Sequence, residues 1–388
     1  MKKLIWMLCI AAALVACEKN NPTTPQDNTE KQDTTQKSDT TQIPDTTQLP
    51  EYDESLILGA DLSLLPRYEQ DKAVYRDTLG KAVEPLALFA DQKFNCVRVR
   101  LFVDPDTKSD SCQDLAYVRA FAQQIKAAGF KFMLDFHYSD GWADPVKQTK
   151  PAAWKDLTFD ELTAKVYDYT KEVLTTLNAD GCTPDYIQTG NEITGGMLWE
   201  DGRIGNMSNF CTLLKSAIKA CNECCPEAKI VLHIERPQKT DRVVWFYQSM
   251  NDNSVAYDII GLSYYPHWHG NLTMLSTTLK KLETTFTDKS VMIVEYGYYN
   301  NWYPNDATYD YTATYPATPA GQAKMTQELV TTLRQFKQVN GLFYWFPEEN
   351  EAKWTGIISG WTNRGLFSNS NGRALPALYT LKNFRVKE

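Results

Sequence analysis

Eight short apolar runs, each followed by an amphipathic segment, constrain the fold of this chain more than any other feature. Most of the runs are rich in β-branched and aromatic residues without polar alternation, which is typical of parallel strands buried on both faces. We expect strands at Leu56–Ala60, Cys96–Val103, Lys131–Ser139, Tyr186–Ile193, Lys229–Arg236, Tyr257–Tyr265, Val291–Gly297 and Gly341–Pro347.

Helices are expected between these strands. Asp114–Ala128 carries apolar residues at the spacing of a helical stripe. Thr158 and Glu161 form a capping-box pattern, and Thr318 places a cap residue directly before a proline. A final helix is expected near Ala374–Phe384.

The count of strand–helix pairs predicts the α/β class and a single (β/α)8, or TIM, barrel over residues 56–388. An open, doubly wound sheet shares the alternation. That alternative requires a glycine-rich phosphate-binding turn after the first strand, and the sequence has none there.

The N-terminus predicts export. A basic start precedes the apolar run Leu4–Val15, which is too short to span a bilayer as a helix. Small and apolar residues lead into Cys17 in the pattern of a bacterial lipobox. We expect residues 1–16 to be a lipoprotein signal peptide and Cys17 to be lipidated. An ordinary signal peptide, with Cys17 as a bystander, is the alternative.

Residues 17–55 are rich in Thr, Gln and Asp and hold almost no aliphatic side chains. Such a segment cannot bury enough apolar surface to offset the entropy of ordering, so we expect a disordered linker. With the acyl anchor, it predicts a domain tethered to the bacterial outer membrane, at the cell surface or on the periplasmic face. We expect a monomer.

Charge and cysteine content exclude some partners. The chain has a formal net charge of −8 and no basic block, so nucleic acid is not an expected partner. Cys221 and Cys224 have a metal-like spacing, but no second ligand pair lies near them. Buried thiols or one local disulfide are therefore expected there, and no metal site is predicted.

Polar residues follow every expected strand, at the end where a (β/α)8 barrel builds its active site. Such residues are costly to bury unless they bind something, so a full ring of them predicts a ligand site. The ring comprises Asp61, Arg98, Arg100, Asp135, His137, Tyr138, Asp140, Asn191, Glu192, His233, Glu235, Tyr264, Tyr265, His267, Glu295, Tyr296, Tyr344, Trp345, Glu348 and Glu349.

Glu192 and Glu295 stand out as lone acids that leave the fourth and seventh strands, on opposite sides of the barrel mouth. Glycoside hydrolysis uses such a pair: one acid protonates the leaving oxygen while the other attacks the anomeric carbon. Proximity and burial would raise one pKa and keep that acid protonated near neutral pH. A lone glutamate after a strand is more often a structural ion-pair member, but the two together favour catalysis.

Aromatic content favours a sugar ligand, because Tyr and Trp stack on the apolar faces of pyranose rings. The chain has 10 Trp and 21 Tyr. The alternative, packing between helices, applies to Trp245. The tryptophans expected in loops at the barrel mouth are Trp142, Trp154, Trp199, Trp268, Trp302, Trp354 and Trp361.

Several longer motifs occur in order from residue 56 to the end of the chain. They are Gly59-Ala-Asp-Leu-Ser63, Val97-Arg-Val-Arg-Leu-Phe102, Asp135-Phe-His-Tyr-Ser-Asp-Gly-Trp-Ala-Asp-Pro145, Gly190-Asn-Glu-Ile193, Val294-Glu295, Gly341-Leu-Phe-Tyr-Trp345, Trp361-Thr-Asn-Arg-Gly-Leu-Phe367 and Gly372-Arg-Ala-Leu-Pro376. This pattern resembles the clan A retaining (β/α)8 glycosidases and, within that clan, glycoside hydrolase family 53, the endo-β-1,4-galactanases.

The resemblance implies residue roles in hydrolysis of β-1,4-galactan, the backbone of type I arabinogalactan. Glu192 would be the acid/base and Glu295 the nucleophile. Arg100 would hold the nucleophile ionised, and either Tyr264 or Tyr265 would donate a hydrogen bond to it.

The other implied contacts are with the sugar. Asn191 would bond the 2-hydroxyl at the cleavage site, with His137 beside that sugar and Trp345 beneath it. The residues implied to bind elsewhere along the substrate are Asp61, Asp140, Trp142 and Trp361.

No cofactor is implied as a requirement. Some bacterial members of the family bind calcium in a long loop after the seventh strand, through a motif rich in Asp, His and Asn. Here that loop, Tyr298–Asp306, lacks the motif, which argues against structural calcium.

Two alternatives stay open. Another clan A β-1,4-glycanase, cutting mannan or glucan, would use the same carboxylates and differ only in its loops. A surface lipoprotein that binds glycans without cleaving them would use the aromatics, but it would have no need for two acids in one cleft. Glu192→Gln and Glu295→Gln would leave such a binder unaffected.

Overall fold

The computed structural model describes residues 50–351 and 362–387. The predicted signal peptide, Cys17 and the linker as far as residue 49 lie outside the described residues, as does Trp361. The folded unit starts at Pro50, slightly before the expected boundary. Tyr52 forms a β-bridge with Val386, and the Asp53 amide donates to the Arg385 carbonyl at 2.7 Å.

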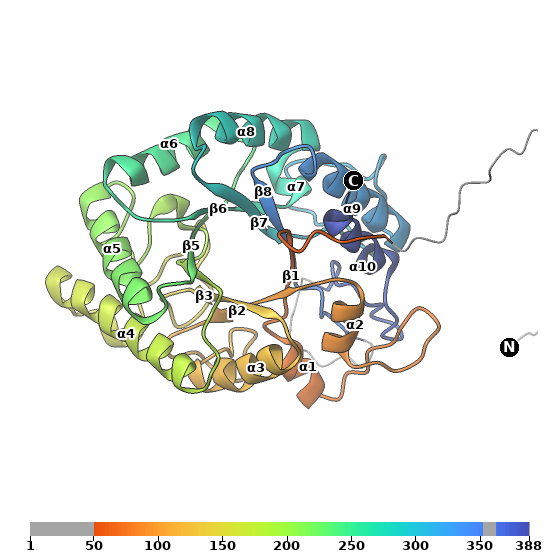
Figure 1. Ribbon diagram of the computed structural model, residues 1–388, viewed down its shortest axis with the longest axis horizontal. Helices are drawn as coiled ribbons and strands as arrows, with labels where there is room; N and C mark the ends of the chain where they lie inside the picture. The colour runs from red at the N-terminus through yellow and green to blue at the C-terminus, as the bar shows by residue number, and fades with distance from the viewer. Residues whose placement is uncertain (1–49, 352–361, 388) are drawn as a thin grey trace, which may run out of the picture. The chain divides into compact units, whose positions relative to one another are not determined.

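Eight parallel strands close into a barrel in chain order, which confirms the predicted (β/α)8 fold. The strands lie at the centre and the helices surround them (Figure 1). Each strand overlaps one of the runs expected from the sequence. Their bounds are β1 Ile57–Asp61, β2 Cys96–Leu101, β3 Lys131–Phe136, β4 Tyr186–Thr189, β5 Lys229–Ile234, β6 Ile259–Tyr264, β7 Ser290–Tyr296 and β8 Val339–Trp345.

The helices connect consecutive strands and cover the outside of the barrel (Figure 1). The α-helices are α1 Leu65–Gln70, α2 Pro85–Asp91, α3 Leu115–Ala127, α4 Phe159–Ala179, α5 Met207–Cys224, α6 Thr240–Asp252, α7 Pro266–His269, α8 Leu272–Thr285, α9 Pro319–Leu333 and α10 Pro376–Leu381. Short 3₁₀ turns occur at η1 Ala152–Trp154, η2 Ile193–Gly195 and η3 Lys382–Arg385.

The helix starts follow the capping chemistry of the sequence. Asp114 accepts from an amide in the first turn of α3, and Thr318 does the same for α9. Thr158 and Glu161 form a complete capping box at α4. Each cap satisfies an amide that the helix itself leaves unpaired, so these three expected boundaries are confirmed.

Two apolar layers flank the strands. The larger packs the outward side chains of the barrel against the helices. The smaller takes at least one residue from every strand, so it fills the barrel interior: Ile57, Cys96, Met133, Tyr186, Val231, Ile259, Met292, Val294 and Phe343. Because side chains alternate along a strand, residues two and four positions beyond this layer face inward at the C-terminal ends.

The seven cysteines of the described chain are all free thiols, and Cys221 is fully buried in α5. The local pairing considered for Cys221 and Cys224 is therefore absent from the structure. Among the described residues, no helix is long and apolar enough to cross a membrane.

Candidate active site

A layer of polar side chains lies directly above the apolar interior layer. Asp61, Arg98, Asp135, Gln188 and His233 each occupy the inward position two residues after a member of that layer or, in β1, four residues after it. All five are fully buried. Their placement shows that strand alternation, rather than loop conformation, builds the floor of the site.

Arg98 is the centre of this floor. Its guanidinium contacts Asp61 Oδ2 at 2.6 Å, Asp135 Oδ2 at 2.8 Å and Glu295 Oε1 at 3.0 Å. It also donates to Asn191 Oδ1 at 3.0 Å. One buried cation thus links three carboxylates with the residue that precedes Glu192, which compensates charges that would otherwise be costly to bury.

Glu295 is held at both carboxylate oxygens. Arg98 contacts Oε1, and the Tyr265 hydroxyl donates to Oε2 at 2.8 Å. Burial is the largest effect and leaves the pKa of Glu295 above its ordinary value, although Arg98 and the Tyr265 hydrogen bond lower it. The two donors therefore favour an ionised carboxylate in a fixed orientation, which is the state required of a nucleophile.

Glu192 lies in a different environment. Its backbone adopts a left-handed conformation, with φ of 48°, at the start of η2. The Ser263 hydroxyl donates to Oε1 at 2.6 Å. Burial, followed by the negative charges of Glu295 and Glu235, raises the pKa of Glu192 well above its usual value. A proton held near neutral pH is the state required of a general acid.

Arg100 does not contact Glu295, so its expected contact with that carboxylate is wrong; Arg98 makes it. Arg100 lies 3.6 Å from Asp61 Oδ1, and its guanidinium stacks over the Trp142 ring at 4.6 Å. Both arginines face inward because they are two residues apart on β2. Arg98 lies at the same depth in the barrel as Glu295, whereas Arg100 lies beside the Trp142 ring.

Two acids expected to bind sugar have partners within the protein. Asp61 is fully buried and engaged by Arg98 and Ser63, so it does not face a substrate. Asp140 is half-buried and accepts from the backbone amides of Asp104 and Ala152 at 3.1 and 2.8 Å. It joins the loops after β2 and β3 and thereby shapes the barrel mouth.

An aromatic wall, formed by Trp142, Trp345 and Tyr265, extends from Glu295, which the Tyr265 hydroxyl contacts. The Trp345 ring lies 6.3 Å from Trp142 and 6.0 Å from Tyr265, edge to face in both pairs. His137 lies 5.9 Å from Trp142, and its Nδ1 accepts from the Ala143 amide at 3.1 Å. Burial lowers the pKa of His137, which favours the neutral imidazole. Because Nδ1 accepts, the proton of that imidazole is on Nε2, which lies 3.1 Å from Asp135 Oδ2.

The structure distinguishes the two tyrosines that the sequence left open. Tyr265 contacts the nucleophile candidate. Tyr264 faces the opposite way, because its hydroxyl donates to the Gly270 carbonyl at 3.0 Å and its ring stacks on Tyr296. Tyr264 is therefore excluded as a contact of Glu295.

Sequence reasoning missed Gln188, Ser263 and Arg364 as parts of the site. Gln188 contacts Asp135, and Ser263 contacts Glu192. Counting inward positions along each strand would have found both. Arg364 comes from the segment after β8, and its guanidinium lies 5.5 Å from the Trp345 ring. No strand periodicity reaches that segment.

A comparison with protein-family models matches residues 57–381 to glycosyl hydrolase family 53. The chain belongs to glycosyl hydrolase family 53. This family 53 chain is a glycosidase, in agreement with the carboxylate pair at the mouth of its barrel.

Curated relatives of this family 53 glycosidase include galactanases. The arabinogalactan endo-β-1,4-galactanase of Cellvibrio japonicus is 35% identical, with 84% of this chain and 90% of that protein covered. The endo-β-1,4-galactanase of Bacillus subtilis is 30% identical, with 80% and 77% covered. Among solved structures, the family 53 catalytic domain from Ignisphaera aggregans has a TM-score of 0.78 and 32% identity, covering 86% of this chain and 98% of that one.

Within residues 50–351 and 362–387, no three His, Cys, Asp or Glu side chains lie close enough together to bind a metal ion. The loop from Tyr298 is anchored by protein contacts. The Asn300 amide nitrogen Nδ2 donates to the Gly365 carbonyl at 2.8 Å, and Asn363 donates to the Trp302 carbonyl at 2.9 Å.

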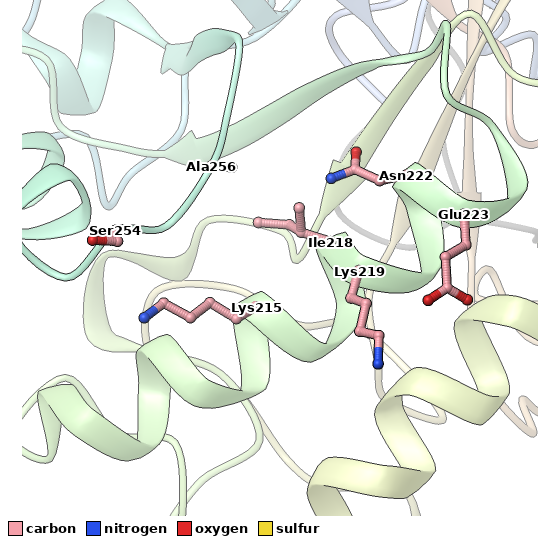
Figure 2. Close-up of a pocket in the computed structure, with 7 residues that line it drawn as sticks. All are labelled: Lys215, Ile218, Lys219, Asn222, Glu223, Ser254 and Ala256. Atoms are coloured by element: carbon pink, nitrogen blue, oxygen red, sulfur yellow. The ribbon is translucent and has the colours of Figure 1, made fainter.

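A separate surface pocket lies away from the catalytic face. Figure 2 shows Lys215, Lys219 and Glu223 projecting from α5 beside the loop that carries Ser254 and Ala256. That loop joins α6 to the start of β6 and therefore lies at the N-terminal end of the strands. In (β/α)8 barrels this end contributes to stability, whereas catalysis takes place at the other.

Proposed function

We propose that this glycosidase is an endo-β-1,4-galactanase that cleaves the galactan backbone of type I arabinogalactan to galacto-oligosaccharides with retention of anomeric configuration. The observation that carries the proposal is the unequal environment of the two glutamates. Arg98 and Tyr265 stabilise the ionised form of Glu295, whereas burial and neighbouring negative charge favour a protonated Glu192.

These environments match the two roles of a retaining mechanism. Glu295 would attack the anomeric carbon while Glu192 protonates the leaving glycosidic oxygen, which gives a covalent glycosyl–enzyme ester. Glu192, now ionised, would then take a proton from a water molecule that attacks the same carbon and frees Glu295. Loss of the charge on Glu295 in the ester lowers the pKa of Glu192, which suits its change from acid to base.

The proposed substrate rests on the similarity to galactanases and on the aromatic side chains of the site. Two relatives at 35% and 30% identity are named endo-β-1,4-galactanases. Trp142 packs edge to face on Trp345, which lies 6.0 Å from the Tyr265 ring that contacts Glu295, and such aromatic rings can stack on a sugar. We retain the proposed sugar contacts of Asn191 and His137, with Trp345 beneath the sugar at the cleavage site.

The test is product analysis on linear β-1,4-galactan, β-mannan and a β-glucan, with the wild type and the Glu192→Gln and Glu295→Gln variants. Short oligosaccharides from galactan alone, absent with Glu295→Gln, support the proposal. Cleavage of mannan or glucan alone would refute the substrate, and binding without cleavage would refute the enzyme mechanism. Proton NMR of the first product supports retention if the β-anomer appears before mutarotation.

We also propose that the chain is tethered through a lipid on Cys17 to the outer membrane, facing the medium, as a monomer. The lipobox pattern and the polar composition of residues 18–49 support this placement. Fatty-acid labelling of the wild type, lost with Cys17→Ala, tests the anchor. Protease treatment of intact cells tests the orientation, because a periplasmic enzyme would survive it.

A further inference from the structure

A chain of hydrogen bonds runs from Glu192 into the barrel interior. Ser263, at the inward position of β6, donates from its hydroxyl to Glu192 Oε1 at 2.6 Å. The Nε2 atom of His233 lies 2.8 Å from the same hydroxyl oxygen. Both Ser263 and His233 are fully buried, so solvent does not compete for these bonds.

The tautomer of His233 decides which atom donates in each of these hydrogen bonds. Its Nδ1 atom faces two N–H groups, Gln188 Nε2 at 3.1 Å and the backbone amide of Glu192 at 3.4 Å. Asn191 Oδ1 is an acceptor 3.1 Å away, but the backbone amide of Glu192 can only donate and therefore fixes Nδ1 as the acceptor. Two donors at Nδ1 require a lone pair there, so the proton of the neutral imidazole is on Nε2.

The donor and acceptor of each hydrogen bond from His233 to Glu192 then follow. An N–H at Nε2 of His233 donates to the Ser263 oxygen, which leaves the single hydroxyl hydrogen of Ser263 for Glu192 Oε1. Oε1 is therefore an acceptor, and the acidic proton of Glu192 resides on Oε2. The burial of His233, together with Arg98 and the other histidines His137 and His269, lowers its pKa well below the usual value, so the imidazole stays neutral.

Resting on the proposed glycosidase mechanism, we propose that His233 and Ser263 are positioning residues that reserve Oε2 of Glu192 as the oxygen that donates and later accepts the catalytic proton. In the first step the Oε2 proton moves to the leaving oxygen and the charge on Glu192 is stabilised by the Ser263 hydroxyl. In the second step a water proton returns to Oε2. Neither Ser263 nor His233 gains or loses a proton.

The first test compares leaving groups with Ser263→Ala. Aryl β-galactobiosides with a 4-methoxyphenol leaving group need protonation, whereas those with 2,4-dinitrophenol do not. We expect kcat/KM to fall about 10- to 100-fold for the former, the range for losing a hydrogen bond to a charged group, with little change for the latter. Ser263→Thr should restore most activity. Ser290→Ala, the same change at the other end of a strand, is the control.

A pH profile separates positioning from a general structural defect. Glu192 also faces Glu295, Glu235 and Asp144, all of which raise its pKa, so the Ser263 donor is the opposing contact. Removing it raises the pKa further, and the alkaline limb of kcat/KM should move to higher pH. Equal losses on both leaving groups, or an unmoved alkaline limb in a variant with wild-type melting temperature, would overturn the proposal.

The second test does not depend on the substrate. The chain has only 4 histidines, so ¹⁵N-histidine labelling gives resolvable imidazole signals, assigned with His233→Gln. We expect His233 to stay neutral with its proton on Nε2. A proton on Nδ1 would reverse the direction of the hydrogen bonds from His233 to Glu192, and it would refute the inference even if galactan is cleaved. Failure to cleave any galactoside, with the Nε2 tautomer present, would instead refute the proposed function.

Discussion

Tyr265→Phe removes a single hydroxyl from the site and therefore tests how Glu295 is kept ionised. That hydroxyl donates to Oε2 of Glu295 at 2.8 Å, while Arg98 contacts Oε1. The phenylalanine ring keeps the packing against Trp345, and the Arg98 contact remains. The variant thus isolates one hydrogen bond to the carboxylate.

The direction and size of the effect follow from that bond. A hydrogen bond to a charged group contributes about 1.5–3 kcal/mol, and one pKa unit corresponds to about 1.4 kcal/mol. Losing the donor raises the pKa of Glu295, since the bond favours the ionised form. A nucleophile must be ionised, so the acidic limb of kcat/KM moves to higher pH, and kcat/KM on that limb falls by about 10- to 100-fold, the equivalent of the lost bond.

The assay is the pH profile of kcat/KM on linear galactan for wild type, Tyr265→Phe and Tyr264→Phe. Tyr264 provides a matched control, because its hydroxyl bonds the Gly270 carbonyl on the other side of the strand. Its profile should keep the wild-type shape. An acidic limb that stays in place for Tyr265→Phe, or moves equally in both variants, would refute the role given to this hydroxyl.

Three further changes probe the floor, a helix start and a buried acid. Arg98→Gln breaks ion pairs with three carboxylates, so calorimetry should show a loss of about 3–5 kcal/mol, whereas Arg100→Gln should retain the fold. Thr158→Ala removes the α4 cap and should lower the free energy of urea unfolding by about 1 kcal/mol. Burial raises the pKa of Glu348 to about 8 from 4.5, so folding stability should fall as pH rises between these values, by on the order of 5 kcal/mol. Glu348→Gln should flatten this pH dependence in urea unfolding.

The sequence was sufficient for the barrel because each strand is marked by its own residues. Runs such as Cys96–Leu101 are apolar on both faces, and caps such as Thr158 mark where helices begin. The strand ends were less accurate. Expected β3 and β4 extended to Ser139 and Ile193, but the strands end at Phe136 and Thr189, because the backbone turns just beyond them, with positive φ at Tyr138 and Gly190.

The depth of a side chain in the barrel could not be read from the sequence. Arg98 and Arg100 share one face of β2, and alternation alone treats them alike. Their levels depend on the stagger of the strands: Asp61 pairs with Arg98, and Arg100 pairs with Asp135. The stagger is a property of the closed barrel, which no single strand encodes.

The two catalytic candidates are where alternation fails. In β7, Met292 and Val294 belong to the interior layer, so strict alternation would turn Glu295 outward. A register shift against β6 pairs Ser263 with Glu295 and brings the carboxylate to the inner face. Just after β4, Gly190 and Glu192 have positive φ values that redirect the chain.

These irregularities have a common consequence. Asp61, Arg98 and His233, which support the site, obey the regular pleat and are positioned by the barrel itself. Glu192 and Glu295 depart from it, each at the point where its side chain must face the other across the mouth. A regular barrel would supply the floor without the pair of acids. Local backbone distortions therefore make this fold a catalytic site, because they bring the two carboxylates to a rigid floor whose charges are already balanced.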